Sequence, residues 1–254
     1  MGVTSAAVSL QVKNLEDWLG LQLFSRRANR IRLTDAGRDY YTNAASALQD
    51  IAGFTQALSD GANPRPLVIS ATPALAQLWL PARLAAFAQM RPDVPVQLRP
   101  EAEETDLEAA GIDLRLAYGG EHPDYRITEL FRDRLVPVAA GPGDLAAMRL
   151  IAVDWGASIT SVPGWQQYFQ AYPQPRPAMV PYRAATVPAA LALVQAGLGA
   201  ALLPEQVIGA ELAAGRLALL SEDALQMPRP YVAITANYKA KSRRISALLG
   251  ALCG

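Results

Sequence analysis

The N-terminal fold is decided by residues 3–34, which read VTSAAVSLQVKNLEDWLGLQLFSRRANRIRLT. Apolar residues recur there at steps of four, three and four, and so share one face of a helix: Val8, Val12, Leu15 and Leu19. Thr4 or Ser5 can cap the start of this helix, because a hydroxyl accepts a hydrogen bond from an unpaired backbone N–H. Gly20 follows the last apolar residue, where a left-handed residue commonly ends a helix.

A short basic hairpin is predicted after this helix. The turn-prone pair Ala28-Asn29 is surrounded by Arg26, Arg27, Arg30 and Arg32. Residues 1–33 carry five basic and two acidic side chains, a formal +3 in a chain whose total is zero. A helix with a small polar face beside a basic hairpin is typical of a DNA-binding domain. The alternative is an ordinary amphipathic helix beside a solvated basic hairpin. The DNA contacts expected on the first interpretation are Thr4, Ser5, Ser9, Lys13, Arg26, Arg27 and Arg30.

The run V-T-S-A-A-V-S-x-Q-V-x-x-L-E-x-W-L-G-x-x-L-F-x-R, followed by L-T-x-A-G, resembles the LysR-type transcriptional regulators. It is more similar to the branch of the glycine-cleavage activators than to the aromatic-catabolism branch. The resemblance implies the recognition helix and wing of a winged helix-turn-helix that binds promoter DNA. Ser5 and Leu10 depart from it, because the family usually has a long polar residue and often an arginine at these places.

Two helices precede the recognition helix in this family, and the chain begins at Met1-Gly2, at the turn between them and the recognition helix. We therefore expect a partial winged helix-turn-helix over residues 1–33. Either the start is misassigned, or the sequence is a truncated form. In the second case the chain would be a ligand-binding and oligomerising protein without sequence-specific DNA binding.

Residues 34–62 are predicted to form a linker helix and its end. Thr34 is a suitable cap, and apolar residues recur at steps close to three and four as far as Leu58. A long helix with an apolar stripe needs a partner, and a second copy of the chain is the simplest one. We expect a homodimer or homotetramer, as the family resemblance implies; the alternative is a helix lying on its own globular domain. Residues 61–66, GANPRP, mark a domain boundary.

From Leu67 onward, predicted strands and helices alternate, which is typical of an α/β fold with parallel sheets. The predicted strands are 67–71, 94–98, 112–117, an edge strand within 130–140, 149–154, 179–182, 200–203 and 231–236. The predicted helices are 73–90, 107–110, 164–171, 186–196, 205–214 and 242–252. Residues 66–254 would then form a two-lobed, periplasmic-binding-protein-like effector domain, with lobe 1 at about 66–140 plus 237–254 and lobe 2 at about 141–236. The runs SATPALAQLWLPARLAAF and ALVQAGLGAALLP also resemble the LysR-type effector domain.

A small-molecule effector is expected at the carboxyl ends of the strands, where helix N-termini converge. Thr72 and Thr186 each bring a hydroxyl next to unpaired backbone N–H groups, an arrangement that suits an anionic ligand. The alternative for each threonine is a plain helix cap. The residues predicted to bind the effector are Thr72, Pro73, Tyr118, Gly119, Ser161 and Thr186.

Enzyme chemistry is not indicated. His122 is the only histidine and Cys253 the only cysteine, too few for a zinc site, and one cysteine cannot form an internal disulfide. The chain contains neither G-x-S-x-G nor a G-x-x-x-x-G-K-S/T phosphate loop. We expect no catalytic residue, metal or cofactor. The first residues do not resemble a signal peptide, and the most apolar stretch, residues 189–204, is too short to span a bilayer, so a cytoplasmic protein is expected.

Overall fold

The computed structural model describes most of the chain as helices, strands and connecting turns. The described residues are 5–27, 30–59, 65–101, 106–120, 125–155, 161–175 and 181–253. They divide into two units, residues 1–65 with 237–241 and residues 66–236 with 242–254. Each unit is described by itself.

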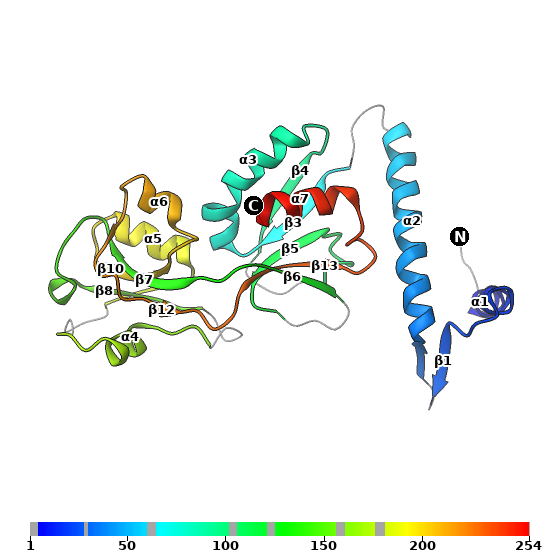
Figure 1. The fold of residues 1–254 in the computed structure, drawn as a ribbon, viewed down its shortest axis with the longest axis horizontal. Coiled ribbons are helices and arrows are strands. Elements are labelled where there is room, and N and C mark those ends of the chain that lie inside the picture. Colours follow the sequence, from blue (N-terminus) through cyan, green and yellow to red (C-terminus); the bar gives the residue numbers. More distant parts are fainter. Residues whose placement is uncertain are drawn as a thin grey trace. The chain divides into compact units, whose positions relative to one another are not determined.

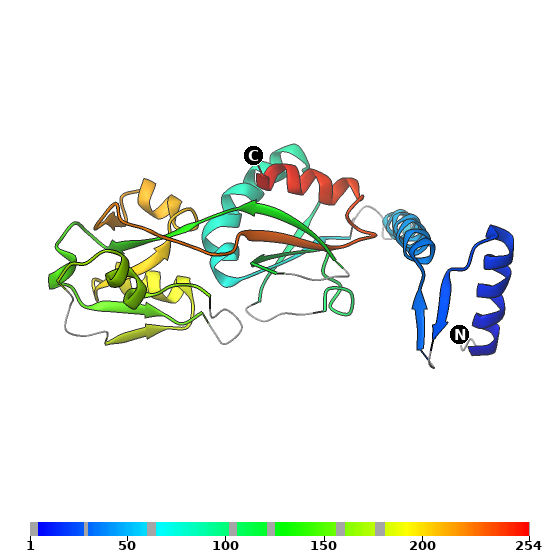
Figure 2. The same cartoon turned by 60° about the horizontal axis from the view of Figure 1, so that its bottom comes forward.

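The first unit contains two helices joined by a hairpin. Helix α1 (Ser5–Leu19) ends at Gly20, whose φ of 67° is left-handed as expected. Strands β1 (Phe24–Arg27) and β2 (Arg30–Leu33) pair antiparallel, with Arg27 opposite Arg30 at the tip. Helix α2 (Asp35–Ser59) follows directly, and its 25 residues correspond to about 37 Å of helix. Figure 2 shows the hairpin, in blue, leading from one helix to the other.

The second unit contains two β-sheets. The first has the order β4-β3-β5-β13-β6 and the second the order β11-β7-β10-β8-β9, with β12 also paired to β7 (Figure 1). The strands of the first sheet are β3 (Leu67–Ala71), β4 (Val96–Pro100), β5 (Leu114–Tyr118), β6 (Tyr125–Phe131) and β13 (Tyr231–Ala236). Those of the second are β7 (Arg134–Ala139), β8 (Leu150–Val153), β9 (Tyr182–Ala184), β10 (Ala200–Pro204), β11 (Ala218–Leu219) and β12 (Leu225–Gln226). The expected two-lobed α/β fold is confirmed.

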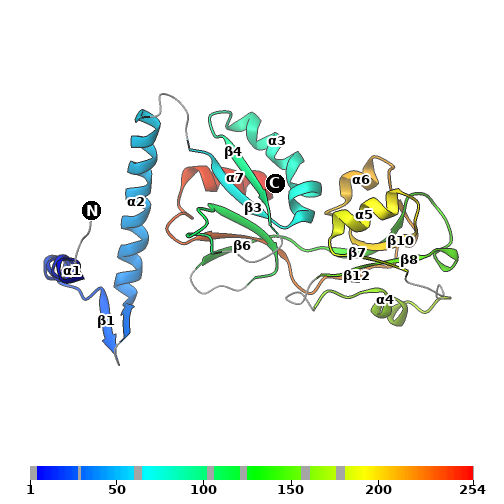
Figure 3. The ribbon, with the colours of Figure 1, turned by 180° about the vertical axis from the view of Figure 1, so that it is seen from behind.

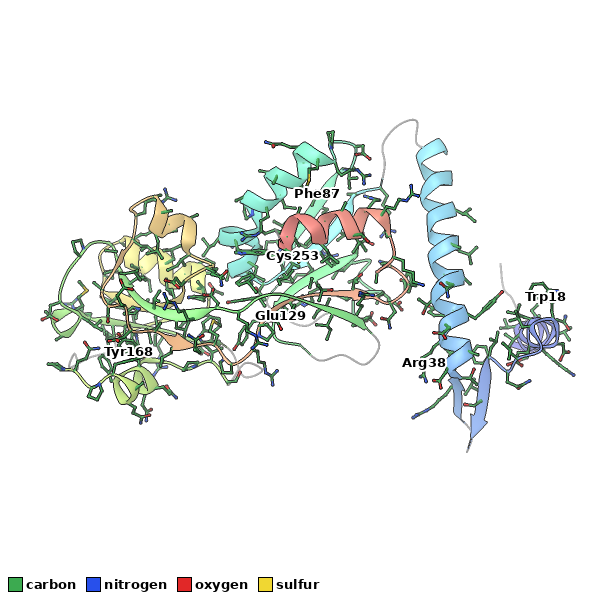
Figure 4. The ribbon with its side chains drawn as sticks, viewed as in Figure 1. Trp18, Arg38, Phe87, Glu129, Tyr168 and Cys253 are labelled. Carbon is green, nitrogen blue, oxygen red and sulfur yellow. The ribbon has the colours of Figure 1, made fainter. Side chains whose placement is uncertain are left out.

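Helices cover both sheets. A π-helical turn (Leu75–Trp79), α3 (Leu80–Met90) and α7 (Arg243–Cys253) lie on the first sheet. Figures 1 and 3 place α5 (Val187–Gln195) and α6 (Gly209–Ala213) on one side of the second sheet and α4 (Trp165–Ala171) on the other. A short 3₁₀ turn, η2 (Leu145–Ala147), precedes β8. Figure 4 labels Phe87, which is buried on α3, and Tyr168, which is buried on α4.

The expected division into lobes differs from the strand pairings at two places. β7 belongs to the second sheet although residues 66–140 were expected in lobe 1. β13 belongs to the first sheet although residues 141–236 were expected in lobe 2. The chain therefore changes sheets between β6 and β7 and returns between β12 and β13, one strand earlier than expected in both cases.

The edge strand expected within residues 130–140 is wrong, because β7 lies inside its sheet. Pro137 lacks an N–H, a feature that usually confines a strand to the edge of a sheet. Instead, two short strands pair with β7 on either side of this proline, β12 at Arg134 and Leu135 and β11 at Val138 and Ala139. The Pro137 carbonyl still accepts a hydrogen bond from the Leu220 N–H. The strand pairing therefore loses only the hydrogen bond that an N–H at position 137 would have donated.

The other differences are local. Residues 107–110 form a turn, the helix expected at 73–90 contains a π-helical turn at Leu75–Trp79, and the helix expected at 205–214 is reduced to Gly209–Ala213. β6, β11 and β12 were not predicted as separate strands. The strand expected at 179–182 is observed at Tyr182–Ala184, and residues 176–180 lie outside the described part of the chain.

Candidate DNA interface and effector site

A glutamate side chain ties the end of α1 to the hairpin. The Glu16 carboxylate accepts hydrogen bonds from the backbone N–H of Leu23 at 2.7 Å and of Phe24 at 3.0 Å. Ionised acceptors make stronger hydrogen bonds than neutral ones. Glu16 is the acidic residue of the L-E-x-W-L-G motif, so this motif position has a structural explanation: it fixes the direction in which the chain leaves the helix.

Thr34 and Gly37 join the hairpin to α2. The Thr34 hydroxyl accepts from the Gly37 N–H at 2.9 Å, which confirms the predicted helix cap, and donates to the Gln22 carbonyl at 2.7 Å. A Cβ atom at Gly37 would lie 2.0 Å from the Leu23 carbonyl oxygen, so only glycine allows this close approach. The L-T-x-A-G motif therefore combines a cap with the point at which α2 contacts the start of the hairpin.

The predicted DNA-contacting residues fall on α1 and the hairpin, and the structure describes two of their side chains. Ser9 and Lys13 are both exposed and lie four residues apart, on one face of α1. Thr4 lies outside the described residues, as do the side chains of Ser5, Arg26, Arg27 and Arg30. The exposed Arg32, opposite Ser25 on the hairpin, extends the basic surface beyond the predicted set.

The predicted apolar face of α1 is not buried in the described structure. Val8 is 51% exposed, and Val12, Leu15 and Leu19 are half-buried. Trp18, labelled in Figure 4, is 80% exposed and lies on the same helix. This part of the unit thus presents apolar side chains beside the polar pair Ser9 and Lys13.

In the second unit, two predicted effector residues lie at the carboxyl ends of adjacent parallel strands. Thr72 follows β3 and Tyr118 ends β5, and the Thr72 N–H donates to the Leu116 carbonyl at 3.1 Å. The Thr72 hydroxyl is buried and has no hydrogen-bond partner among the described residues, so the alternative of a plain helix cap does not apply to it. Pro73, which follows it, is half-buried.

Tyr118 and Gly119 are held by the segment that precedes β13. The Tyr118 hydroxyl accepts from the Arg229 N–H at 3.0 Å, and the Gly119 N–H donates to the Pro230 carbonyl at 2.8 Å. Gly119 has a φ of 65°, and a Cβ there would lie 2.7 Å from Cδ of Arg229. The exposed Arg229 thus packs on a predicted site residue, although the sequence interpretation did not include it.

On the second sheet, Thr186 caps α5, since its hydroxyl accepts from the Ala189 N–H at 3.2 Å. The Thr186 hydroxyl thus acts as a helix cap, which is the alternative to a role in ligand binding. Ser161 is exposed and follows the end of β8 in the chain.

Trp155 also follows β8, and its ring centroid lies 6.4 Å from that of Tyr118. This ring contact brings the carboxyl edges of the two sheets together. The hydrogen bonds and ring contacts of the described residues do not link Ser161 or Thr186 to Thr72.

His122 lies outside the described residues. In the part of the chain that the structure describes, His, Cys, Asp and Glu side chains do not gather into a group that could hold a metal ion. None of the described helices combines the length and apolar character that crossing a lipid bilayer requires.

Comparisons with known proteins agree with this architecture. Residues 60–253 match the LysR substrate binding domain, and residues 1–38 match the bacterial regulatory helix-turn-helix protein, lysR family. The glycine cleavage system transcriptional activator of Escherichia coli K12 is 34% identical over 139 residues, 54% of this chain and 46% of that protein. The match thus spans about half the length of that relative. The HTH-type transcriptional regulator TrpI of Pseudomonas aeruginosa is 30% identical over 231 residues, 85% of this chain and 77% of that protein.

Among solved structures, Vibrio fischeri DarR in complex with DNA is similar over 100% of this chain and 90% of that one, with a TM-score of 0.56 and 22% identity. The effector domain of AmpR from Pseudomonas aeruginosa is similar over 74% of this chain and 93% of that domain, with a TM-score of 0.59 and 21% identity. Helix α1, the basic hairpin, the long helix α2 and the two-lobed α/β unit together lie within the two matched domains of one family of bacterial regulatory proteins. The chain belongs to the LysR family.

Proposed function

We propose that this chain is a DNA-binding transcriptional regulator whose activity is set by a small molecule bound between the two lobes. The observation that carries the proposal is the set of contacts made by Glu16, Thr34 and Gly37, which join α1, the hairpin and α2 in the segment that matches the family's helix-turn-helix. These motif residues shape the unit that would present α1 and the hairpin to DNA.

On promoter DNA, Ser9 and Lys13 of α1 would face the major groove, together with Ser5 and the preceding Thr4. Arg26, Arg27 and Arg30 would contact phosphates at the tip of the hairpin. Each phosphate contact releases counterions from the DNA. Each contact therefore increases the magnitude of the negative slope of log affinity against log salt by about 0.9.

Fluorescence anisotropy with a DNA fragment selected from the source genome tests the wing. Replacing Arg26, Arg27 and Arg30 together by Gln should lower the magnitude of the salt slope by about 3, roughly 0.9 for each lost phosphate contact. The matched control is Arg149→Gln, an exposed arginine of the second unit, which should leave the slope unchanged. A slope unaltered by the triple substitution would contradict the role of the hairpin.

The effector would lie at the carboxyl edges of the two sheets, where the Tyr118 and Trp155 rings meet. The unpartnered Thr72 hydroxyl could donate to it, and Thr186 and Ser161 could contact it from the second lobe. An anionic ligand fits the converging backbone N–H groups at helix starts. A thermal-shift screen of small carboxylic acids tests this site. A hit should lose its stabilising effect in Thr72→Val, and a hit that stabilises the variant equally would place the ligand elsewhere.

Assembly as a homodimer or homotetramer would use α2, on which Leu48 is 65% and Ile51 is 62% exposed. Light scattering of a Leu48→Lys, Ile51→Lys variant should show a smaller species than the unmodified chain. We propose the segments 1–33, 34–62 and 66–254 as DNA-binding, linker and effector-binding parts, with the lobes divided as the strands pair. As a regulator of promoters the chain would act in the cytoplasm, by binding and not by catalysis.

A second candidate is a ligand-binding and oligomerising protein without sequence-specific DNA binding. The exposed Val8 and Trp18 on α1 favour it, because an apolar helix face left open would weaken the unit that meets DNA. Specific retention of an operator fragment at about 150 mM salt would exclude this candidate.

A further inference from the structure

Two segments of the chain cross between the lobes, residues 132–133 after β6 and residues 227–230 before β13 (Figure 1). They are bonded to each other, because the Met227 N–H donates to the Asp133 carbonyl at 3.0 Å. The Asp133 side chain is buried, and its carboxylate accepts from the Arg134 N–H at 2.8 Å. The second segment, the return crossing, is therefore held in place by hydrogen bonds to the first.

Three arginines lie on or directly beside these crossings, and two of them are paired with carboxylates. The Arg132 guanidinium binds Glu129, which Figure 4 labels, at 3.0 Å. The Arg134 guanidinium binds the Glu205 carboxylate through two of its nitrogens. Arg229 is exposed, and no carboxylate among the residues that the structure describes lies within ion-pair distance of it. The return crossing thus carries a positive charge that the described residues do not neutralise.

Arg229 is held against the end of β5, at the edge where the effector is proposed to bind. Its N–H donates to the Tyr118 hydroxyl at 3.0 Å, and the following Pro230 carbonyl accepts from the Gly119 N–H at 2.8 Å. The Arg229 side chain lies over Gly119, where a Cβ atom would be 2.7 Å from its Cδ and 3.5 Å from its Nη1. The missing side chain at position 119 therefore makes room for the arginine at this edge.

A second polar group without a partner lies at the same edge. Thr72 follows β3, which pairs in parallel with β5, and its N–H donates to the Leu116 carbonyl at 3.1 Å. The Thr72 hydroxyl is buried, and none of the described residues forms a hydrogen bond with it. Leaving a buried hydroxyl unpaired is unfavourable, so a ligand that accepts from it gains stability there. A donating hydroxyl and an unpaired guanidinium both favour a negatively charged acceptor.

We propose that Arg229 recognises a carboxylate of the effector, and that the effector is a small carboxylic acid bound in its ionised form. The inference rests on the proposed effector site and adds the residue that selects the charge of the ligand. The planar fork of an arginine fits the two oxygens of a carboxylate. A primary amide has the same shape but no charge, and its NH₂ group would meet the donors of the arginine, so the site discriminates against it.

The place of Arg229 in the chain gives this contact a further consequence. Arg229 belongs to the return crossing and to no strand of either sheet. A carboxylate bound to it therefore contacts the connection about which the two lobes would close, in addition to the Thr72 edge of the first lobe. Charge recognition and lobe closure thus involve the same short segment.

The first test measures whether the guanidinium is available, and it needs no ligand. Phenylglyoxal reacts fastest with arginine side chains that are accessible and not ion-paired, and peptide mass mapping of the full chain gives the rate at each arginine. We expect Arg229 to react about as fast as the exposed Arg149 and faster than Arg134, which Glu205 holds. If Arg229 reacted as slowly as Arg134, its charge would not be free to bind a ligand, and the proposal would be overturned.

The second test measures the selection of charge by thermal-shift titration. The probes are acetate, succinate, benzoate and L-alanine, each beside its primary amide. At least one acid should stabilise the chain more strongly than its amide does. Arg229→Gln should weaken binding of that acid by roughly 10- to 100-fold, the range for a hydrogen bond to a charged group, and Arg229→Lys by less. The control Arg132→Gln removes an arginine that is already paired and should bind the acid as the unmodified chain does.

The outcomes separate this proposal from the proposed function. Stabilisation by amides but not by acids, or equal binding of an acid by Arg229→Gln and the unmodified chain, would leave an effector site and overturn the role of Arg229. If neither the acids nor the amides stabilise the chain, the carboxylate proposal falls, and the proposed effector site loses its support with it.

A glycine pair separates the position of Arg229 from backbone strain. Gly119 and Gly111 have φ values of 65° and 66°, so alanine strains the backbone similarly at both. A Cβ at Gly111 meets nothing within 4 Å, whereas one at Gly119 displaces the Arg229 side chain. Gly119→Ala should therefore weaken binding of the acid, and Gly111→Ala should not, although both lower the melting temperature. Equal acid binding by the two variants would contradict the assignment of Arg229.

Discussion

Replacement of Gly37 by alanine tests the contact that joins the linker helix to the hairpin. The added Cβ would lie 2.0 Å from the Leu23 carbonyl oxygen. An ordinary C···O contact is about 3.3 Å, so α2 or the hairpin must move by roughly 1.3 Å. The obstacle is backbone and cannot rotate away, so we expect the upper part of the ~1–3 kcal/mol range for overpacking.

Alanine also stabilises a helix by about 1 kcal/mol relative to glycine, which offsets part of this cost. The net expectation for Gly37→Ala is therefore a destabilisation of about 2 kcal/mol in the first unit. Gly250→Ala is the matched control: Gly250 lies inside α7 and a Cβ there meets nothing within 4 Å, so it should be stabilising by about 1 kcal/mol.

Hydrogen exchange of the amides at the start of α2 measures the effect directly. Gly37→Ala should raise the exchange rate at residues 34–42 and weaken binding to a selected DNA fragment. If Gly37→Ala and Gly250→Ala both slow exchange in their own helices, the close approach to Leu23 does not limit the structure, and the explanation of the L-T-x-A-G motif is wrong.

Three further predictions concern single side chains. Glu16→Gln should destabilise the first unit by about 1.5 kcal/mol or more in urea unfolding, because two N–H groups lose a charged acceptor, whereas the exposed Asp17→Asn should change little. Thr186→Ala should cost about 1 kcal/mol through loss of the α5 cap, and Thr186→Ser should restore it; equal melting temperatures for both would refute the cap. The pKa of Asp133 lies at about 6 in the fold against 3.8 in the unfolded chain, so its contribution to stability is full below pH 3.8 and is lost as pH rises through about 6, a change of about 3 kcal/mol. Asp133→Asn should remove this part of the pH dependence, and an identical pH profile would contradict the assignment.

Much of the fold could be predicted because local patterns decided it. Gly20 and Thr34 acted as the helix end and helix cap that their residue types indicate. Strands β3 and β13 lie where their apolar runs predicted. In each case the physical cause, a left-handed residue, a capping hydroxyl or a buried apolar run, is contained in a few consecutive residues.

The arrangement of the crossings could not be predicted in this way. β7 was expected at the edge of a sheet. Only its pairing with β11 and β12, residues more than 75 positions further along, explains how Pro137 is accommodated inside the sheet. Asp133 accepts from backbone N–H groups 73 and 74 positions away, and backbone donors leave no trace in the residue types. Such contacts are created by the tertiary fold.

The candidate sites were predictable to different degrees. The shared face of Ser9 and Lys13 follows from helical spacing, since residues four apart lie on one side of a helix, whereas their contact with DNA stays a prediction. The choice of Thr72 and Tyr118 as candidate residues follows from the rule that ligands bind at the carboxyl ends of parallel strands. Arg229 did not follow, because its contact with Gly119 arises only when the segment before β13 returns to the end of β5.

The most direct measurement of the central claim is selection of source-genome DNA fragments by the purified chain at about 150 mM salt, followed by sequencing. We expect enrichment of a discrete set of promoter fragments, lost in Lys13→Glu and retained in the control Lys241→Glu, whose exposed lysine lies outside α1 and the hairpin. Uniform recovery of all fragments, or equal enrichment by the unmodified chain and Lys13→Glu, would contradict sequence-specific recognition by α1.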